Sequence, residues 1–270
     1  MRRLIPLLLA AFSSVAVAEY SAVPGGVAVI DLPAEFAPDW RVTMDGKPLH
    51  WRYRGDAPVA FVGVPLGFEG ETISIEVTTP LGKTTRLSKT VGTKAYREQR
   101  ITLKNNDYVS PKPKQLERIG AEREIIDAAL NHYSTSVAAT DRMVPPVDGR
   151  RSSSFGLRRF FNDQPRKPHS GMDIAAVTGT PIAAPLAGQV IATGDWYFNG
   201  RSVIVDHGRG LITLYCHLDE IAVAEGQSLA TGETLGTVGA TGRVTGAHLH
   251  WGVYLNGTAV DPAMFIDDEQ

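Results

Sequence analysis

Four side chains in the C-terminal half of the sequence have the types and spacing of a metal site. Three residues separate His169 from Asp173, and one residue separates His248 from His250. Because side chains alternate along a β-strand, the last two histidines share one face of a strand and can point into one cleft. If His169 and Asp173 meet one of these histidines, the three ligands leave a fourth tetrahedral position open for water. That layout is typical of a catalytic zinc, whereas a structural zinc would close the position.

The order of these motifs resembles that of the lysostaphin-type (LytM-like) zinc endopeptidases, which cut peptidoglycan peptides. That family has H-x-x-x-D, then Y-x-H-L, then H-x-H, and the middle motif reads YCHL here at residues 215–218. The resemblance covers residues 144–266, and the helical H-E-x-x-H zinc motif is absent. By position the resemblance implies one zinc per chain with the ligands His169, Asp173 and His250. It also implies two catalytic histidines that are not ligands, His217 and His248.

The chemistry expected of such a site needs groups beyond the metal. A bound zinc lowers the pKa of water to about 7 and polarises a carbonyl, so peptide hydrolysis needs no protein nucleophile. One further group should accept a proton from the water, and another should stabilise the carbonyl oxygen or protonate the leaving amine. His217 and His248 suit both roles because imidazole titrates near neutral pH, and the sequence leaves their order open. Asp173 could also orient His169 by a hydrogen bond, but the resemblance favours direct ligation.

The N-terminus has the pattern of a secretory signal peptide. Arg2 and Arg3 precede an apolar run at residues 4–15, and an A-x-A site follows, so we expect cleavage after Ala18. The alternative is an N-terminal membrane anchor, although the run is shorter than the roughly 20 residues that span a bilayer. No cysteine follows the run, which excludes lipidation there. We therefore predict an exported, periplasmic protein with no stable membrane insertion after cleavage.

Composition indicates a globular and slightly acidic chain. Its 270 residues, 43% of them hydrophobic, suffice for one or two domains with real cores. Without Arg2 and Arg3, 25 basic residues face 29 acidic ones, and the resulting formal charge of -4 disfavours a nucleic-acid partner. The single cysteine, Cys216, cannot form an internal disulfide and is predicted to be a buried strand residue. His207 is predicted to be a hydrogen-bonded residue at a strand end.

Two β-rich regions flank a predicted helix, and we assign the whole chain to the all-β class. After the signal peptide (residues 1–18), short apolar or alternating runs separated by turn residues predict a small β-sandwich-like N-terminal domain at residues 19–105. Residues 106–142 are predicted to form a linker and a helix. Residues 143–268 are predicted to form the zinc metallopeptidase domain, for which the resemblance implies a lysostaphin-type antiparallel sheet.

The predicted helix and N-terminal domain also carry expectations about packing. Helical spacing places five apolar residues on one stripe, which we expect to pack between the two β-rich regions. These residues are Leu116, Ile119, Ile126, Leu130 and Tyr133. The N-terminal domain is expected to lie beside or over the cleft and to limit access to it.

These features together predict a secreted zinc metalloendopeptidase, a peptidoglycan hydrolase that acts on stem peptides. The resemblance implies, for periplasmic members, a DD-endopeptidase that opens D-Ala to meso-diaminopimelate cross-links. Diaminopimelate carries a carboxylate, which Arg158 or Arg243 at the rim could contact. One alternative is a non-catalytic wall-binding or hydrolase-regulating protein of the same fold, which should lack a ligand. Another is a zinc peptidase for Gly-rich proteins. The sequence leaves open whether the protein has a protein partner.

Overall fold

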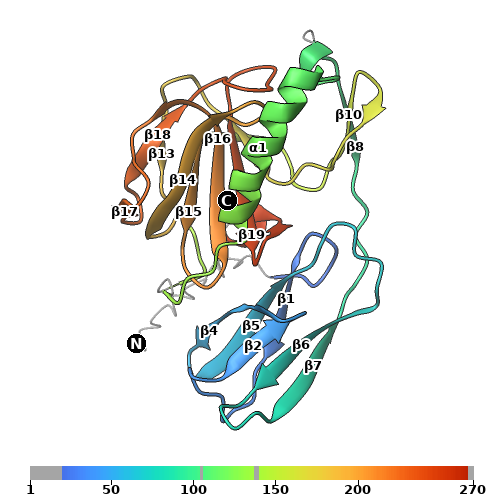
Figure 1. The fold of residues 1–270 in the computed structure, drawn as a ribbon, viewed down its shortest axis with the longest axis vertical. Helices are drawn as coiled ribbons and strands as arrows, with labels where there is room; N and C mark the ends of the chain where they lie inside the picture. Colours follow the sequence, from blue (N-terminus) through green and yellow to red (C-terminus); the bar gives the residue numbers. More distant parts are fainter. Residues whose placement is uncertain (1–19, 104–105, 137–139, 267–270) are drawn as a thin grey trace, which may run out of the picture.

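The computed structural model describes residues 20–103, 106–136 and 140–266 (Figure 1). The predicted signal peptide lies outside these residues. Within them, two β-rich regions with their own apolar clusters are joined by a helix, which confirms the predicted all-β class. Among the described helices, none combines the length and the apolar character that a membrane span requires.

The N-terminal region is a sandwich of two antiparallel sheets. One sheet has the strand order β1-β5-β4 and the other β3-β2-β6-β7. In β6, Ile73, Ile75 and Val77 are buried and alternate with more exposed residues, as expected of a strand with one face in a core. The strands are β1 (Val27–Asp31), β2 (Arg41–Met44), β3 (Lys47–Pro48), β4 (His50–Arg54), β5 (Ala57–Gly63), β6 (Thr72–Thr78) and β7 (Thr84–Thr90).

The C-terminal region is built on one large antiparallel sheet. Its main path runs β17-β14-β15-β16-β19-β12-β9, and β13, β18 and β20 pair at its margins. The strands are β9 (Arg150–Ser153), β12 (Met172–Ala175), β13 (Pro181–Ala183), β14 (Gly188–Trp196), β15 (Gly200–Asp206), β16 (Leu211–Ile221), β17 (Ser228–Leu229), β18 (Thr234–Val238), β19 (Leu249–Leu255) and β20 (Thr258–Val260). A short 3-10 helix, η2 (Pro262–Met264), follows the last strand.

A smaller sheet joins the two regions beside the cleft. It has the order β11-β10-β8, in which β8 (Glu98–Ile101) pairs in parallel with β10 (Arg158–Phe161), and β11 (Gln164–Pro165) pairs with β10. The chain that leaves the sandwich is thereby hydrogen-bonded to the segment that leads into the first metal motif.

The sandwich packs against the larger region through an apolar surface on β5. Val59 and Phe61 belong to the same buried cluster as Val253 and Phe265 of the C-terminal region. The opposite face of β5, with Ala60 and Val62, belongs to the core of the sandwich. Strand β5 is therefore covered on both sides, which explains its nearly continuous apolar sequence.

Helix α1 (Pro113–Leu130) covers one face of the large sheet. In Figure 1 the helix lies in front of this sheet. Its residues Ile126 and Leu130 pack with Ile212 and Leu214 of β16. The expectation that the stripe packs between the two β-rich regions is therefore wrong for the helix, and Leu116 is 54% exposed. Tyr133, which follows the helix, does contact the sandwich: its hydroxyl donates to the carbonyl oxygen of Leu49 at 3.5 Å. The physical reason lies in β16, where both alternating sets of side chains are apolar, so the second face of the sheet also needs a cover.

Asp141 is the centre of a buried polar cluster between the sandwich and the start of the C-terminal region. Its carboxylate accepts hydrogen bonds from Tyr20 Oη at 2.9 Å, Arg52 at 2.8 Å and Arg54 at 3.0 Å. Burial alone would raise the pKa of Asp141, but the hydrogen bonds from Arg54 and Tyr20 and the charges of both arginines outweigh it. The net result is a lowered pKa, so the folded state favours the ionised form.

Replacing this carboxylate should weaken the fold. We expect Asp141→Asn to reduce the free energy of unfolding by roughly 2–3 kcal/mol at pH 7, because it removes a buried carboxylate that bonds to the half-buried Arg52 and to the more exposed Arg54. Since the folded pKa lies below the unfolded value near 3.9, the stabilisation is complete above that value. It is lost as the pH falls through the folded pKa.

The measurement is urea denaturation of the wild type and the variant from pH 7 down to pH 3. Glu98→Gln serves as the matched control, since the Glu98 side chain is 44% exposed in its ion pair with Arg158 and should change stability by less than about 1 kcal/mol. A stability difference that stays constant over this pH range would contradict the role of Asp141.

Candidate metal centre

Strand pairing brings Asp173, His250 and Cys216 into one row across the sheet. Asp173 on β12 pairs with His250 on β19, and His250 pairs with Cys216 on β16. Directly paired residues on antiparallel strands point to the same face. Cys216 packs in the cluster beneath α1, so the row faces the helix-covered side of the sheet. His248 lies two residues before His250 and takes the same side.

His217 joins this side through a break in the strand pattern. Regular alternation would turn it away from the face occupied by Cys216. However, His217 has a φ of 68°, and the register between β15 and β16 shifts at this point. Its ring centroid consequently lies 4.9 Å from that of His248 and 6.1 Å from that of His250.

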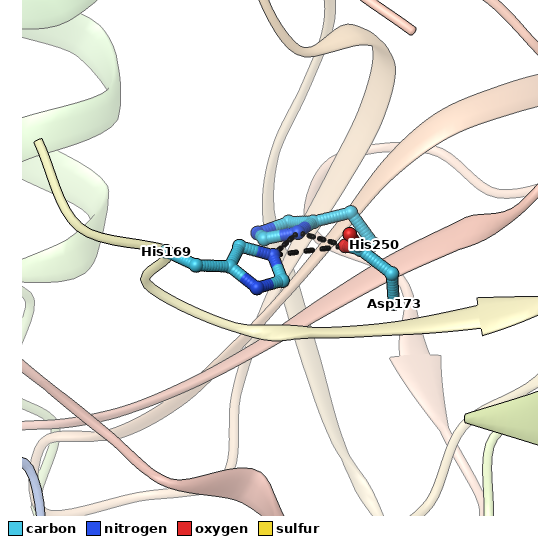
Figure 2. Close-up of side chains that lie close together, drawn as sticks. All are labelled: His169, Asp173 and His250. Atoms are coloured by element: carbon cyan, nitrogen blue, oxygen red, sulfur yellow. Dashed lines mark hydrogen bonds and ion pairs between the residues drawn. The ribbon is translucent and has the colours of Figure 1, made fainter. Parts of the chain in front are cut away.

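The donor atoms of His169, Asp173 and His250 converge on one point (Figure 2). His169 Nε2 lies 2.9 Å from Asp173 Oδ1 and 3.0 Å from His250 Nδ1, and His250 Nδ1 lies 2.8 Å from the same carboxylate oxygen. All three residues are buried, and their ligand atoms lie within 4.8 Å of one another. Of the predicted site residues, the structure thus brings these three together, with His217 and His248 alongside.

Hydrogen bonds outside the triad orient its donor atoms. His169 Nδ1 lies 2.8 Å from the carbonyl oxygen of Ser154 and donates to it, which leaves Nε2 as a bare acceptor. Arg159 donates to Asp173 Oδ2 at 2.8 Å and leaves Oδ1 facing the imidazoles. Burial would raise the pKa of Asp173, but its close contacts with the imidazoles of His169 and His250 outweigh burial and hold that pKa well below its usual range.

This donor set fits a divalent metal ion. With Nδ1 of His169 committed as a donor, Nε2 and the oxygen of Asp173 are two acceptors only 2.9 Å apart, a contact that a cation between them would relieve. Ligands at 2.0–2.1 Å around a tetrahedral zinc lie about 3.3 Å from one another, so the donor atoms need to separate by only a few tenths of an ångström.

Gly171, between His169 and Asp173, allows the close approach of the loop to β19. A Cβ atom there would lie 2.5 Å from the carbonyl oxygen of Trp251 and 2.7 Å from His250 Cε1. Any larger residue would therefore push the loop away from the ligand triad.

His217 and His248 are held by main-chain carbonyl groups instead of by the triad. His217 Nδ1 lies 2.9 Å from the oxygen of Thr241, and His248 Nδ1 lies 2.9 Å from that of Gly246. Burial, together with the neighbouring His250 and His248, lowers the pKa of His217 to about 3, so this ring is neutral at pH 7. With Nδ1 as the donor, Nε2 of both rings is available as a proton acceptor.

The site opens into a cleft of about 570 Å³ between the large sheet and α1. The side near the metal motifs includes His169, His217 and His250, and the facing wall comes from η1 (Asn106–Tyr108) and α1. Only part of the expectation for the N-terminal domain holds: β8 lies beside the cleft through its pairing with β10, whereas no residue before Tyr108 lines the cleft in the described part of the chain.

Other sequence predictions for this region can be compared directly. Cys216 is a buried strand residue, and burial raises its thiol pKa to about 12, as expected for an inert side chain. His207 bonds to the Ala187 carbonyl and to Thr213, as predicted for a structural histidine. Arg243 lines the cleft, whereas Arg158 is exposed, pairs with Glu98 and does not line it.

Two contributors to the site were missed in the sequence. Arg159 is one, and no sequence signal marks its contact with Asp173. Gly171 could have been recognised, because a glycine inside a ligand motif often marks a close backbone approach.

Comparison with known proteins identifies the family. Residues 167–262 match the model of peptidase family M23. A crystal structure of a peptidase M23 from Pseudomonas aeruginosa is similar, with 40% sequence identity and a TM-score of 0.77. The match covers 94% of this chain and 98% of that one. The chain belongs to peptidase family M23, which confirms the resemblance to lysostaphin-type peptidases.

Two curated relatives match less than half of the chain. The chain is 40% identical over 119 residues to the peptidoglycan DD-endopeptidase ShyA of Vibrio cholerae, covering 43% of this chain and 28% of that protein. It is 41% identical over 118 residues to the DD-carboxypeptidase/endopeptidase Mpg of Neisseria meningitidis, covering 44% of this chain and 27% of that protein. The match therefore spans less than a third of the length of these relatives.

A metal-binding experiment can distinguish the three predicted ligand residues from the two neighbouring histidines. We expect one divalent metal ion per chain in the wild type and in His217→Ala and His248→Ala, whose rings lie outside the convergent triad. His169→Ala and His250→Ala should lose the metal, because only two donors would remain. Elemental analysis after dialysis gives the stoichiometry, and circular dichroism checks that each variant is folded. Full metal occupancy in either ligand variant would contradict the assignment.

Proposed function

We propose that this chain is a zinc metalloendopeptidase that hydrolyses peptide cross-links of peptidoglycan. The observation that carries the proposal is the convergence of His169, Asp173 and His250 at the base of a cleft, with His217 and His248 beside them. Membership of a peptidase family and the names of the matched relatives support the same reaction class.

Zinc is the metal that best suits this set of donors. Two imidazole nitrogens and one carboxylate oxygen are borderline ligands that zinc accepts, and three protein ligands leave a place for water or substrate. Zinc bound there would polarise the scissile carbonyl and lower the pKa of water to about 7. The fixed tautomer of His169 and the Arg159 contact with Asp173 would hold the ligands in place.

The two remaining histidines supply proton transfer and charge stabilisation. Each ring has Nδ1 fixed by a main-chain oxygen, so each can present Nε2 to the water or to the substrate. One of them accepts the proton of the attacking water. The other, once protonated, donates to the carbonyl oxygen or to the leaving amine. Both rings lie beside the ligand triad, as this division of work requires: the His217 ring centroid lies 6.1 Å from that of His250, and His248 Nε2 lies 3.9 Å from Asp173 Oδ1.

The substrate we propose is the D-Ala to meso-diaminopimelate cross-link. The relatives that match this region are named as DD-endopeptidases or DD-carboxypeptidase/endopeptidases, and the cleft carries arginines that suit a carboxylate-bearing peptide. A non-catalytic member of the fold is disfavoured, because this chain keeps all three ligand residues and both additional histidines.

The cellular setting and the domain division belong to the same proposal. The signal-peptide pattern of residues 1–18 supports export, and a cross-link substrate supports the periplasm. The separate cores of the sandwich and the large sheet support the division into an N-terminal domain at 19–105, a linker and helix at 106–142, and a peptidase domain at 143–268.

Digestion of purified peptidoglycan tests the reaction and the bond. We expect cross-linked muropeptide dimers to be converted to monomers while glycan strands stay intact, and chelator should stop the conversion. Chromatography with mass spectrometry identifies the released fragments. Cleavage confined to pentaglycine peptides or to Gly-rich proteins would overturn the proposed substrate, and no cleavage by the metal-loaded protein would overturn the proposed reaction.

The two non-ligand histidines should affect turnover without affecting metal content. We expect His217→Ala and His248→Ala each to lower kcat by roughly 10²- to 10⁴-fold, the usual contribution of a positioned acid or base. His207→Ala is the control, because that ring bonds only to Ala187 and Thr213 away from the cleft. Its metal-loaded, folded fraction should turn over at close to the wild-type rate. Near-normal turnover in either of the first two variants would remove that residue from the mechanism.

A further inference from the structure

Arg243 occupies an unusual position on the wall of the cleft. Its guanidinium stacks between two aromatic rings, 4.3 Å from the ring centroid of Phe198 and 4.7 Å from that of Phe161. Its main-chain N–H donates to the carbonyl oxygen of Phe198 at 3.0 Å. Stacking between two rings leaves the edge of the guanidinium, which carries its N–H donors, free to bind in the plane of the group.

The loop that carries Arg243 is rigidly tied to the site. Thr241, two residues earlier, holds His217 through its carbonyl group. Gly242 has a φ of 73°, and a Cβ there would lie 2.4 Å from the main-chain nitrogen of Gly200. The loop is therefore in close contact with the start of β15. The position of Arg243 is therefore fixed relative to His217.

No carboxylate neutralises Arg243 within the part of the chain that the structure describes. Its guanidinium has one weak hydrogen bond, in which Nη1 donates to the carbonyl oxygen of Tyr108 at 3.5 Å. Burial, together with the charges of Arg159 and Arg166, lowers its pKa to about 10, and the group still stays protonated at neutral pH. A partly buried cation beside two like charges is an unfavourable arrangement that a bound anion would relieve.

Most other charged groups on the cleft wall have partners, and Lys167, which also lines the cleft, lies on the exposed loop before His169. Arg159 is paired with Asp173, and Arg166 donates to the carbonyl oxygens of Val109 and Pro165 and to the side chain of Gln164. The acidic residues that α1 contributes to the cleft are also engaged: Glu122 pairs with Arg118, and Asp127 pairs with Arg123. Among the half-buried cations on this wall, Arg243 is the one whose donors are least used, and Arg166 and the exposed Lys167 add positive potential nearby.

We infer that Arg243 forms a carboxylate-binding subsite, which selects peptides with a free carboxylate on the carbon next to the scissile nitrogen. The inference rests on the proposed peptidase function and names the group by which that site would recognise its substrate. Guanidinium and carboxylate match as two parallel N–H···O bonds, and the two flanking rings fix the plane in which these bonds form. Diaminopimelate cross-links have such a carboxylate, whereas a glycine bridge has none.

The experiment uses three cross-link peptides and the full-length, zinc-loaded protein. The first peptide has the free carboxylate beside the scissile nitrogen, and the second has a carboxamide at that position. The third has a free carboxylate only at its C-terminus. It tests whether the carboxylate must lie next to the scissile nitrogen. The variants are Arg243→Gln and Arg243→Lys, with Arg158→Gln as the control. Arg158 carries the same charge as Arg243, but it pairs with Glu98 and does not line the cleft.

We expect the wild type to cleave the first peptide with a kcat/KM roughly 10- to 100-fold above that of the second and third, the range for a hydrogen bond to a charged group. Arg243→Gln should abolish this preference mainly by raising KM for the first peptide, with turnover of the carboxamide peptide retained as evidence of a folded site. Arg243→Lys should keep part of the preference, and Arg158→Gln should keep all of it.

If Arg243→Gln lowered kcat/KM equally for all three peptides, Arg243 would have a structural role and the subsite would be overturned. A preference unchanged in that variant, or a wild type that favours the third peptide as strongly as the first, would overturn it too. Binding of the peptides by calorimetry to the wild type and Arg243→Gln, without turnover, separates this inference from the proposed function. Carboxylate-selective binding that depends on Arg243 but no cleavage would refute the peptidase activity alone, whereas cleavage without carboxylate selectivity would refute the subsite alone.

Discussion

The pairing register of β12, β19 and β16 is the constraint on which the site depends. It places Asp173 opposite His250 and His250 opposite Cys216, so one row across the sheet fixes both a carboxylate and an imidazole. A slip of one residue in either pair would turn the ligand to the other face, into the buried cluster that contains Trp251. The apolar residues on both sides of the ligands prevent such a slip, so the core of the peptidase region specifies the geometry of the site.

Arg159 connects this row to the rest of the chain. It neutralises Asp173 on the side away from the imidazoles, and its Nε donates to Gln99 of β8 at 3.0 Å. Gln99 in turn donates to Ser153 at 3.4 Å. A buried carboxylate between two imidazoles and one guanidinium keeps its charge because these contacts offset its desolvation cost. The segment that follows the sandwich therefore supports the site through hydrogen bonds, in addition to lying beside it.

The motif spacing predicts that His169 and Asp173 meet one of the two histidines of H-x-H, and the resemblance to the family selects His250 as the third predicted ligand. His248 and His250 follow strand alternation, and the H-x-x-x-D spacing brings His169 back to Asp173 through a short loop. The position of His217 depends on a φ of 68° at a register shift, which no alternation pattern predicts. The prediction for the packing of α1 failed for a different reason. An apolar stripe shows that one face of a helix is covered, but it does not show which surface covers that face. The aromatic cage of Arg243 combines Phe161 and Phe198 from separate segments, so only the tertiary structure shows it.

The electrostatics of the cleft explain why a separate carboxylate subsite would help such an enzyme. With zinc bound, two positive charges of the metal and one of Arg159 would face the single negative charge of Asp173, which favours the negative charge that develops on the scissile carbonyl oxygen. The same positive field attracts any carboxylate of the substrate, and a carboxylate that reached the metal would compete with water as a ligand. A guanidinium held between two rings on a different loop gives that carboxylate another partner. Positive charge can then be strong throughout the cleft without the substrate blocking the metal.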